Sequence, residues 1–474
     1  MTPRVRKTAG EGWSLWRGGT VSGVDELVER LRGEVGGPVL VPGDEGFAEE
    51  VAGFNTAVTH SPAVAVGITS EADAAAVVRA AADAGLPIRM LATGHGTPAV
   101  TDGVLVTTSR LTGVTVDPDQ KVAHIAAGSR WAEVIAAAGQ HGLAPIIGAS
   151  DAVGCIGYTL GGGLGPLART YGVSSDWARG FRIVTGTGEV VTANADEHSD
   201  LFWALRGGKG GFGLVTSMDF ALVELTTLYG GSVFFDAPDI ARVFMTWASW
   251  TKTLPETANS SVVILRLPPL EFIPEPLRGK TVLNVRFAFI GDPAEGQRLF
   301  RPIRDAGTAI VDSVGEMPAT DIALIHNDPK DPVAAWDQGV LLRDIDAGFA
   351  SAFLEVVGPE QQVPLVAVEI RHLGGAAHRD VPEGSAVGGR GGAYSLVMIG
   401  VPDPGLFETV LPAAAGGVLD RLSAWVSPET TVNFAAAFSL PCSYEAAWPA
   451  DTFARLAEVR ASYDPQELFP YGPS

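Results

Sequence analysis

The sequence predicts an α+β protein of two lobes, and three observations support this fold class. The chain has 474 residues, more than one hydrophobic core usually serves, so at least two lobes are expected. The N-terminal half alternates short apolar strands with helical stretches. The second half contains further strand-like runs, which are Val262–Leu265, Thr281–Phe289, Leu365–Arg371 and Tyr394–Gly400.

Composition narrows the classes of partner and location. A formal net charge of −21 repels nucleic acid and anionic membranes, so neither is expected as a partner. No apolar run follows the basic start Met1–Trp13, and no apolar stretch of about 20 residues occurs, so we expect neither a secretory signal nor a membrane span. With only Cys155 and Cys442, a disulfide framework or a multi-cysteine metal site is not expected. These features predict a soluble, cytoplasmic protein without a metal.

A β-α-β unit opens the ordered part of the chain. The apolar run Ala63–Ile68 predicts a strand, and Ser70 predicts the N-cap of an alanine-rich helix that ends at Gly85. Pro87–Leu91 is the next strand, and the loop 92–97 follows it. Since ligands gather at the carboxyl ends of such strands, His95 in this loop is expected to face a ligand.

Glycine is the compositional outlier, at 58 residues, or roughly 12% against about 7% on average. The glycines gather in three loops, 92–97, Gly154–Gly165 and Arg206–Gly213. The segments between them predict strands at Val104–Thr107, Val122–Ala126, Phe181–Thr185 and Val190–Thr192, and helices at Arg130–Gln140 and Ser199–Leu205. Backbone that approaches an extended phosphate closely would explain such loops. Ordinary tight turns are the alternative.

Two segments match the dinucleotide-binding sequence pattern, but their flanking segments do not have the secondary structure that this pattern requires. Gly208-x-Gly210-x-x-Gly213 is followed by a strand-like run, and Gly163-x-Gly165-x-x-Ala168 is preceded by a glycine-broken segment. The dinucleotide-binding mechanism needs a strand before the glycines and a helix after them. Both segments fail that test, and the P-loop pattern is absent, so a Rossmann site is not favoured.

The order and spacing of these motifs resemble the berberine bridge enzyme-like oxidases of the vanillyl-alcohol oxidase superfamily. The motifs that carry the resemblance run from Val41–Asp44 and Phe54–Asn55 through Pro62–Ala63, Gly94–His95, Thr159–Gly165 and Asp200–Gly208 to Arg455–Leu456, Tyr463–Pro465 and Leu468–Phe469. The resemblance implies a PCMH-type FAD-binding domain over 1–216 and a C-terminal return segment over 425–474 that completes it. Between them, 217–424 would form a substrate-binding domain, an antiparallel sheet backed by helices.

By this resemblance, His95 matches the histidine that bonds covalently to the 8α-methyl of FAD. The reaction needs a neutral imidazole, which a loop histidine can supply; a histidine that only hydrogen-bonds is the alternative. Ser150 stands where some relatives carry a second tethering cysteine, so one tether is expected, and Cys155 is expected to pack as a small hydrophobe. Val153 matches the position that controls access of O₂. The full expected FAD-binding set is His95, Thr93, Gly94, Gly96, Thr97, Ser150, Val153, Gly154, Gly157, Tyr158, Gly162, Gly163, Gly165, Gly213 and Val215.

The chain departs from the family at the base positions. Thr431 stands where relatives commonly have a tyrosine, and Val397 stands at a second, polar or acidic position; neither side chain is a base near neutral pH. Glu369, Tyr394 and Tyr158 are the candidate replacements. Alternatively, Glu369 pairs with Arg371, which lies on the same strand face, and the tyrosines are core residues with satisfied hydroxyls.

These observations predict an FAD-dependent oxidase. A small organic substrate would pass hydride to the flavin, and O₂ would take the electrons to give H₂O₂. Because the base positions are changed, a flavin-dependent oxygenase or a non-redox cyclase or rearrangement enzyme on the same scaffold is the alternative. A protein that only stores FAD is a third possibility, which elaborate cofactor sites make unfavourable. The substrate and the oligomeric state do not follow from the sequence.

Overall fold

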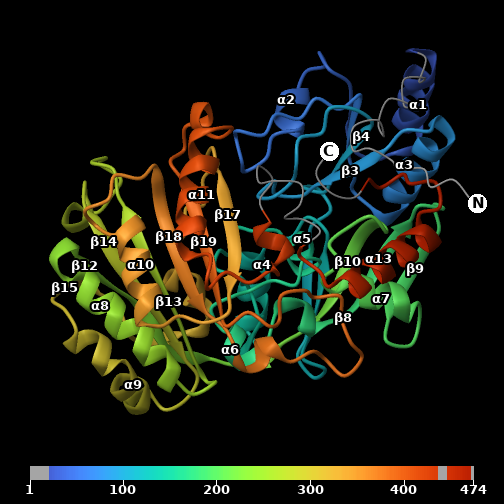
Figure 1. Ribbon diagram of the computed structural model, residues 1–474. Helices are drawn as coiled ribbons and strands as arrows, with labels where there is room; N and C mark the ends of the chain where they lie inside the picture. The colour runs from blue at the N-terminus through green and yellow to red at the C-terminus, as the bar shows by residue number, and fades with distance from the viewer. Residues whose placement is uncertain (1–20, 436–445, 471–474) are drawn as a thin grey trace, which may run out of the picture.

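The computed structural model describes residues 21–435 and 446–470, and it has two lobes side by side (Figure 1). The first lobe contains a four-stranded sheet in the order β1-β2-β4-β3 and a five-stranded sheet in the order β5-β6-β10-β8-β9. The second lobe is built on one larger sheet in the order β15-β12-β14-β13-β18-β19-β17, with β16 paired to β12. A mixed α+β architecture of two lobes confirms the predicted fold class.

The four-stranded sheet contains the predicted β-α-β unit. Its elements are α1 (Val21–Glu34), β1 (Val39–Leu40), α2 (Phe47–Glu50), β2 (Val64–Gly67), α3 (Glu71–Ala84), β3 (Ile88–Leu91) and β4 (Val104–Thr107). β2, β4 and β3 run parallel. The predicted helix ends are confirmed, since Ser70 Oγ accepts the N–H of Asp73 at 3.1 Å and Gly85 ends α3 with φ of 63°. The loop 92–97 therefore leaves the carboxyl end of β3.

The five-stranded sheet is antiparallel throughout. Its strands are β5 (Val114–Asp117), β6 (Val122–Ala126), β8 (Ala178–Thr185), β9 (Val190–Asn194) and β10 (Gly213–Ala221). The helices around it are α4 (Trp131–Gly139), α5 (Cys155–Thr159), α6 (Ala168–Tyr171) and α7 (Ser199–Leu205), and the short strands β7 (Leu143–Ala144) and β11 (Val223–Glu224) pair beside it. The loop 150–157, which includes the first residues of α5, lies on this sheet's side of the lobe.

The sheet of the second lobe is also antiparallel. Its strands are β12 (Thr227–Asp236), β13 (Ala258–Arg266), β14 (Thr281–Phe289), β15 (Ala309–Asp312), β16 (Gly315–Pro318), β17 (Asp337–Leu342), β18 (Leu365–His372) and β19 (Tyr394–Gly400). Its long helices are α8 (Ala237–Trp250), α9 (Pro293–Asp305), α10 (Ala347–Val357) and α11 (Val410–Leu422). The four strands predicted between 262 and 400 are confirmed.

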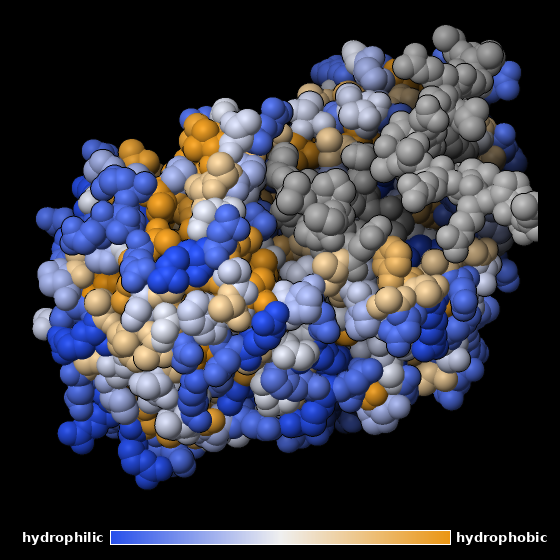
Figure 2. Space-filling view, viewed as in Figure 1, coloured by the Kyte–Doolittle hydropathy of each residue, from blue (hydrophilic) through white to orange (hydrophobic). Residues whose placement is uncertain are grey.

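The two faces of this sheet differ in what covers them. On one face, Ile370, Leu396 and Met398 pack with the helix residues Trp247 and Phe353 in a continuous apolar core. The other face, here called the inner face, carries the alternate residues of the same strands. It meets the first lobe, because Arg371 Nη1 donates to the carbonyl of Leu164 and Leu341 packs against Leu164. The surface over the outermost helix α9 is polar (Figure 2).

The C-terminal part of the chain returns to the first lobe. Helix α13 (Ala450–Tyr463) packs against α7, and the guanidinium of Arg455 lies 3.8 Å from the ring centroid of Trp203. Arg460 donates to the carbonyls of Gly208 and Gly210, and the indole of Trp448 donates to that of Gly207. The third glycine-rich loop therefore binds this return segment. No helix within 21–435 and 446–470 is long and apolar enough to cross a bilayer.

Candidate functional site

The loop that follows β3 presents unpaired backbone donors. Gly94 has φ of 74°, and a Cβ there would lie 2.6 Å from the Cα of Gly53, so only glycine fits. Within the described part of the chain, the N–H groups from Gly94 to Thr97 have no hydrogen-bond partner. Gly96 is exposed, with nothing within 4 Å of the place a Cβ would occupy. Successive free N–H groups on an open loop form a cradle for an anion such as a phosphate.

His95 is held by two contacts at this loop. Its ring stacks on that of Phe54, and its Nδ1 lies 2.9 Å from Thr93 Oγ1. Burial lowers the pKa of His95 to about 4, and the positive charge of Arg130 acts in the same direction. The imidazole is therefore neutral at neutral pH. A neutral, positioned imidazole is the form that can bond to an electrophilic carbon.

The loop 150–157 lies directly against the first loop. The N–H of Gly154 points at Thr93 Oγ1 at 3.4 Å, so Thr93 joins the two loops. Gly157 is exposed and has open space where a Cβ would be, which leaves its backbone accessible. Ser150 accepts the N–H of Ala152 at 3.3 Å, and the side chain of Val153 is partly exposed. Nine predicted cofactor positions, from Thr93 to Gly157, thus lie on these two adjoining segments.

Tyr158 and the glycines after it have a different role. Its ring occupies the space beside Gly148 and Gly163, where a Cβ on Gly163 would lie 2.5 Å from the ring, and it meets Trp131 edge-on at 6.2 Å. The Tyr158 hydroxyl is buried without a hydrogen-bond partner among the described residues, and burial raises its pKa. Gly165 packs against the carbonyl of Ile147. Tyr158 therefore shapes the interior of the site, and its hydroxyl is too weak an acid to ionise near neutral pH.

The remaining predicted cofactor positions lie elsewhere. Gly213 and Val215 are on β10, opposite Thr185 and Ile183 of β8, and Val215 is buried in the apolar core that also contains Cys155. Cys155 is fully buried, and burial raises the pKa of its thiol well above the usual value. This placement fits the expected packing role of Cys155 and disfavours its reaction with a ligand.

On the inner face, Glu369 is the centre of a buried charge cluster. Arg286 Nη1 donates to Glu369 Oε1 at 2.7 Å, Arg371 donates through Nε and Nη2 to Oε2 at 2.9 and 2.8 Å, and Ser261 Oγ donates to Oε1 at 2.9 Å. The imidazole of His326 lies 3.3 Å away. The two guanidinium groups hold the pKa of Glu369 well below its usual range. The pairing alternative is confirmed, and this geometry makes Glu369 a poor base.

Three contacts join the loops of the first lobe to the second lobe. Asn55, next to Phe54, exchanges two hydrogen bonds of 2.9 Å with the backbone of Ala335, and Phe54 accepts the N–H of Val333 at 2.9 Å. Lys330 pairs with Asp151 at 2.8 Å. The segment 326–335 therefore runs along the border from the Glu369 cluster to His95. These contacts place both loops at the border between the two lobes.

Comparison with known proteins relates the two loops to an FAD binding domain. The model of the FAD binding domain matches residues 62–194, which include both loops. The curated relative YgaK of Bacillus subtilis, an uncharacterized FAD-linked oxidoreductase, is 28% identical over 301 residues, 62% of this chain and 64% of the relative. Residues 62–194 of this chain are therefore similar to an FAD binding domain, and a longer part of it is similar to an FAD-linked oxidoreductase. The alignment spans less than two thirds of that relative's length.

Solved structures that are similar to this chain share its fold. BBE-like 1 of Physcomitrella patens matches with a TM-score of 0.80 at 19% identity, over 94% of this chain and 99% of that one. Glucooligosaccharide oxidase of Acremonium strictum, whose structure concerns a 6-S-cysteinyl, 8α-N1-histidyl FAD, matches with 0.80 at 20% identity, over 95% and 98%. The predicted fold resemblance is confirmed. The unpaired N–H cradle, the open glycines and the neutral His95 are features that fit an FAD.

Tyr394, predicted as a catalytic candidate, lies on the helix-covered face of the sheet. Its hydroxyl is 3.0 Å from Thr251 Oγ1, and its ring stacks on that of His372 with centroids 5.1 Å apart. Its neighbour in the core is Trp247. The core alternative describes this placement, and Tyr394 has no path to the FAD side of the sheet.

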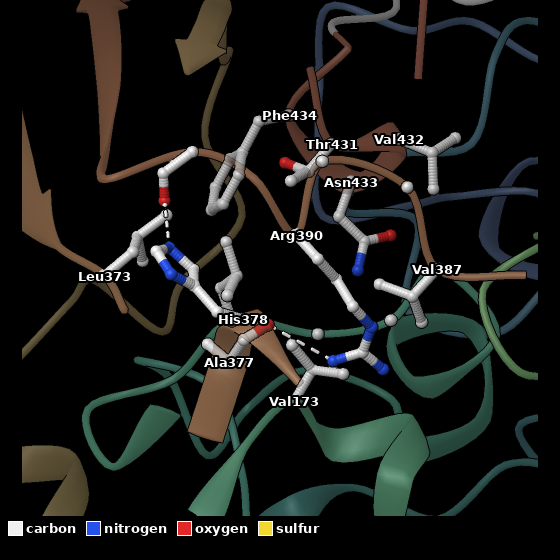
Figure 3. Close-up of a pocket in the computed structure, with 17 residues that line it drawn as sticks. Val173, Leu373, Ala377, His378, Val387, Arg390, Thr431, Val432, Asn433 and Phe434 are labelled. Carbon is white, nitrogen blue, oxygen red and sulfur yellow. Dashed lines mark hydrogen bonds between the residues drawn. The ribbon is translucent and has the colours of Figure 1, made fainter. Parts of the chain in front are cut away.

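One of the two altered base positions, Thr431, borders a narrow pocket. Thr431 and Phe434 line it together with Gly161–Gly163, His378 and Arg390, and Figure 3 shows Thr431 and Phe434 on the side opposite His378. Val397 lies on the inner face between Gly339 and Glu369. Neither Thr431 nor Val397 brings a titratable group to the site.

Sequence reasoning missed a half-buried lysine, Lys209, beside the loop 150–157. Lys209 Nζ donates to the carbonyl of Gly157 at 2.9 Å and to Asn433 Oδ1 at 2.6 Å, and Asn433 Nδ2 donates to the carbonyl of Tyr158 at 2.9 Å. Burial lowers the pKa of Lys209 to about 8. Lys209 and Asn433 thus tie the return segment to α5. A lysine inside a glycine-rich loop was the available signal, but its partner is 224 residues away.

Proposed function

We propose that this protein is an FAD-dependent oxidase that removes hydride from a small organic molecule and passes the electrons to O₂, releasing H₂O₂. The observation that carries the proposal is the junction of the two loops at Thr93, with His95 beside it and Val153 partly exposed on the second loop. Bound FAD supplies a two-electron acceptor that protein side chains lack. The oxidase named among the structural relatives is in keeping with this proposal.

We further propose that His95 carries the FAD covalently and alone. Its low pKa keeps the imidazole unprotonated, and the Phe54 ring and Thr93 hydroxyl fix its direction. Glucooligosaccharide oxidase is described with a histidyl and a cysteinyl link. This chain has Ser150 at the position that the resemblance assigns to the second link, and the nearby Cys155 is buried with a raised thiol pKa.

The chain's own groups have separate tasks in this reaction. Backbone N–H groups of 94–97 would bind the cofactor's phosphates, and the Asn55–Ala335 and Lys330–Asp151 contacts hold the second lobe over the site. The valine at position 153 leaves O₂ a path to the cofactor, by resemblance to the family.

A flavin-dependent oxygenase or a non-redox cyclase is the second candidate. The observation that favours it is the apolar or hydroxyl character of Val397 and Thr431, where relatives have groups suited to proton removal. In either activity, the substrate would not transfer a hydride to the flavin.

Anaerobic mixing with candidate donors separates the two functions. An oxidase should lose its flavin absorbance when an alcohol, sugar, phenol or amine donor is added without O₂, and should release peroxide when air is admitted. A protein that transforms its own substrate while its flavin stays oxidised under anaerobic conditions would show that the oxidase proposal is wrong. The second candidate would then take its place.

A further inference from the structure

Asp337 lies on the inner face of the second lobe's sheet. The register of β17 with β19 is continuous from Asp337 to Leu342, and Val397 lies between Gly339 and Glu369. Side chains two residues apart on a strand point to the same face. Asp337 is therefore on the same face as Glu369. Trp336 and Leu342 are an odd number of residues from Asp337 and are buried in the core between the sheet and its helices. This placement also puts Asp337 on the inner face.

The Asp337 carboxyl has no hydrogen bond or ion pair among the described residues. The residue is half-buried, so its carboxyl oxygens remain free to accept a hydrogen bond from a ligand on this face. Burial alone raises its pKa to about 6, and no neighbouring charge contributes. This value suits a group that accepts a proton near neutral pH.

Within the described part of the chain, Asp337 has no ion pair because the basic side chains nearest to it lie on a more distant strand or are paired with other residues. Glu369 and Arg371 are on β18, two strands away, so the spacing of about 4.8 Å between strands puts them at about 10 Å or more. β19 brings only Ser395, Val397 and Ile399 to the inner face. The preceding segment contributes Asp328, Lys330 and Asp331, of which Lys330 is paired with Asp151. Asp337 is thus outside the Glu369 cluster.

The row of residues that includes Asp337 is otherwise apolar and open. Across the sheet it runs through Leu265, Ala367 and Ile399. Ile399 is 37% exposed although it lies on the inner face, so this part of the face is not filled by the first lobe. Ala367, by contrast, is buried, so the row opens to solvent at its Ile399 end. Apolar surface is visible on this lobe beside α11 and along its border with the first lobe (Figure 2).

Asp337 is also close along the chain to the His95 side of the site. Ala335, two residues before Asp337, forms two hydrogen bonds with Asn55. Phe54, the residue before Asn55, stacks on His95. The start of β17 is therefore anchored to the loop that is proposed to carry the FAD.

We propose that Asp337 accepts the hydroxyl or amine proton of the substrate, and that the apolar row beside it binds the substrate's carbon skeleton. This inference rests on the proposed oxidase function. The substrate C–H bond breaks with both electrons leaving to FAD, the O–H or N–H proton goes to Asp337, and a C=O or C=N bond forms. O₂ then takes two electrons and two protons and leaves as H₂O₂. The substrate is thus an apolar alcohol or amine rather than an oligosaccharide.

The FAD-loaded protein and its Asp337→Asn variant test the assignment. Infrared difference spectra between pH 5 and pH 8 should show a protonated carboxyl that titrates near pH 6 in the wild type and is missing from the variant. The matched control is Asp331→Asn, an exposed acid of the same segment, which should retain the signal. A signal that persists in Asp337→Asn would assign the group elsewhere and overturn the proposal.

Anaerobic reduction of the same proteins tests the role. With benzyl alcohol or geraniol as donor, the wild-type rate should rise through pH 6 and level off, while Asp337→Asn should be slower by on the order of 10²–10⁴ and lose this pH dependence. Wild-type rates and pH profile in a folded, FAD-loaded variant would overturn the base assignment and leave the oxidase standing. If cellobiose is the only donor that reduces the flavin, the apolar row does not bind the substrate's carbon skeleton. If no donor reduces the wild type, the oxidase function itself has failed.

Discussion

The imidazole of His95 lies face to face on the phenyl ring of Phe54, with ring centroids 3.9 Å apart and planes 9° from parallel. Phe54 is itself fixed from both lobes, because its N–H donates to the carbonyl of Thr93 at 2.8 Å and its carbonyl accepts the N–H of Val333. The histidine proposed to carry FAD is therefore oriented by a residue that depends on the contact between lobes.

Phe54→Ala should slow covalent attachment of FAD about fivefold. A stacked aromatic pair contributes about 1 kcal/mol, and a barrier higher by that amount corresponds to roughly a fivefold lower rate. The measurement is the share of yellow colour that stays in the pellet after acid precipitation. Phe47→Ala, a change at another phenylalanine of the same lobe, should leave this share unchanged. His95→Ala should bind FAD and release all of it on denaturation.

Peptide mapping should find flavin on the His95 peptide alone. Ser150 lacks the thiol for a second bond, and the Cys155 side chain is fully buried with a raised thiol pKa. Thiolate is the reactive form, so this cysteine should be inert. An intact mass one FAD above that of the polypeptide would agree. Flavin on a peptide that contains Cys155 would contradict both the loop alignment and the single tether.

Local patterns in the sequence were sufficient for the FAD side of the molecule. The caps at Ser70 and Gly85, the strand before loop 92–97 and the placement of His95 all depend on residues close together in the chain. The inner face depends on which side of a strand meets the other lobe. Period-two alternation separates two faces but does not say which is covered by helices, so Tyr394 was expected near the cavity and lies in the core.

Asp337 could not be recognised from its own segment. Asp and Gly are disfavoured in strands, and Asp337-Gln338-Gly339 therefore gives no strand signal. The Glu369 cluster shows the same limit, since Arg286 comes from a strand 83 residues away. Only the Glu369–Arg371 pair, whose members are two residues apart on one strand, could be predicted from the sequence.

Glu369→Gln should destabilise the protein by about 3–5 kcal/mol, because it leaves Arg286 and Arg371 as buried charges without a counter-ion. Chemical denaturation of the FAD-loaded protein measures this loss. The control is Glu256→Gln, which removes an exposed partner of Arg379 and should change stability little. A variant that folds with wild-type stability but reduces its flavin 100-fold more slowly would instead make Glu369 the base.

Val153→Leu should slow reoxidation of the reduced flavin while leaving anaerobic reduction by substrate nearly unchanged. Val153 is partly exposed on the loop beside Thr93, so an added methylene narrows the approach of O₂. Stopped-flow mixing of the reduced protein with air-saturated buffer measures this step. Val116→Leu, at a valine that packs against the same core from the edge strand β5, should have no effect. Equal reoxidation rates in both variants would remove Val153 from the oxygen path.

The Asp337→Asn variant should gain stability over the wild type as the pH rises from 4 to 7. The folded-state pKa of Asp337 is raised to about 6 from an ordinary 3.8, so between these values the folded protein holds a proton that the unfolded chain has released. Wild-type stability therefore falls as pH rises through this window and is level above it. One pKa unit is worth about 1.4 kcal/mol, so the full loss is at most about 3 kcal/mol.

Denaturation of both FAD-loaded proteins at pH 4, 5, 6 and 7 measures this difference. Asparagine does not titrate, so the free energy of unfolding of the variant, relative to the wild type, should be near zero at pH 4 and about 1–3 kcal/mol higher at pH 7. Asp331→Asn should show no such slope. A difference that stays flat over this range would mean that the Asp337 carboxyl ionises at its ordinary pH, and it would then be too weak a base for the role proposed here.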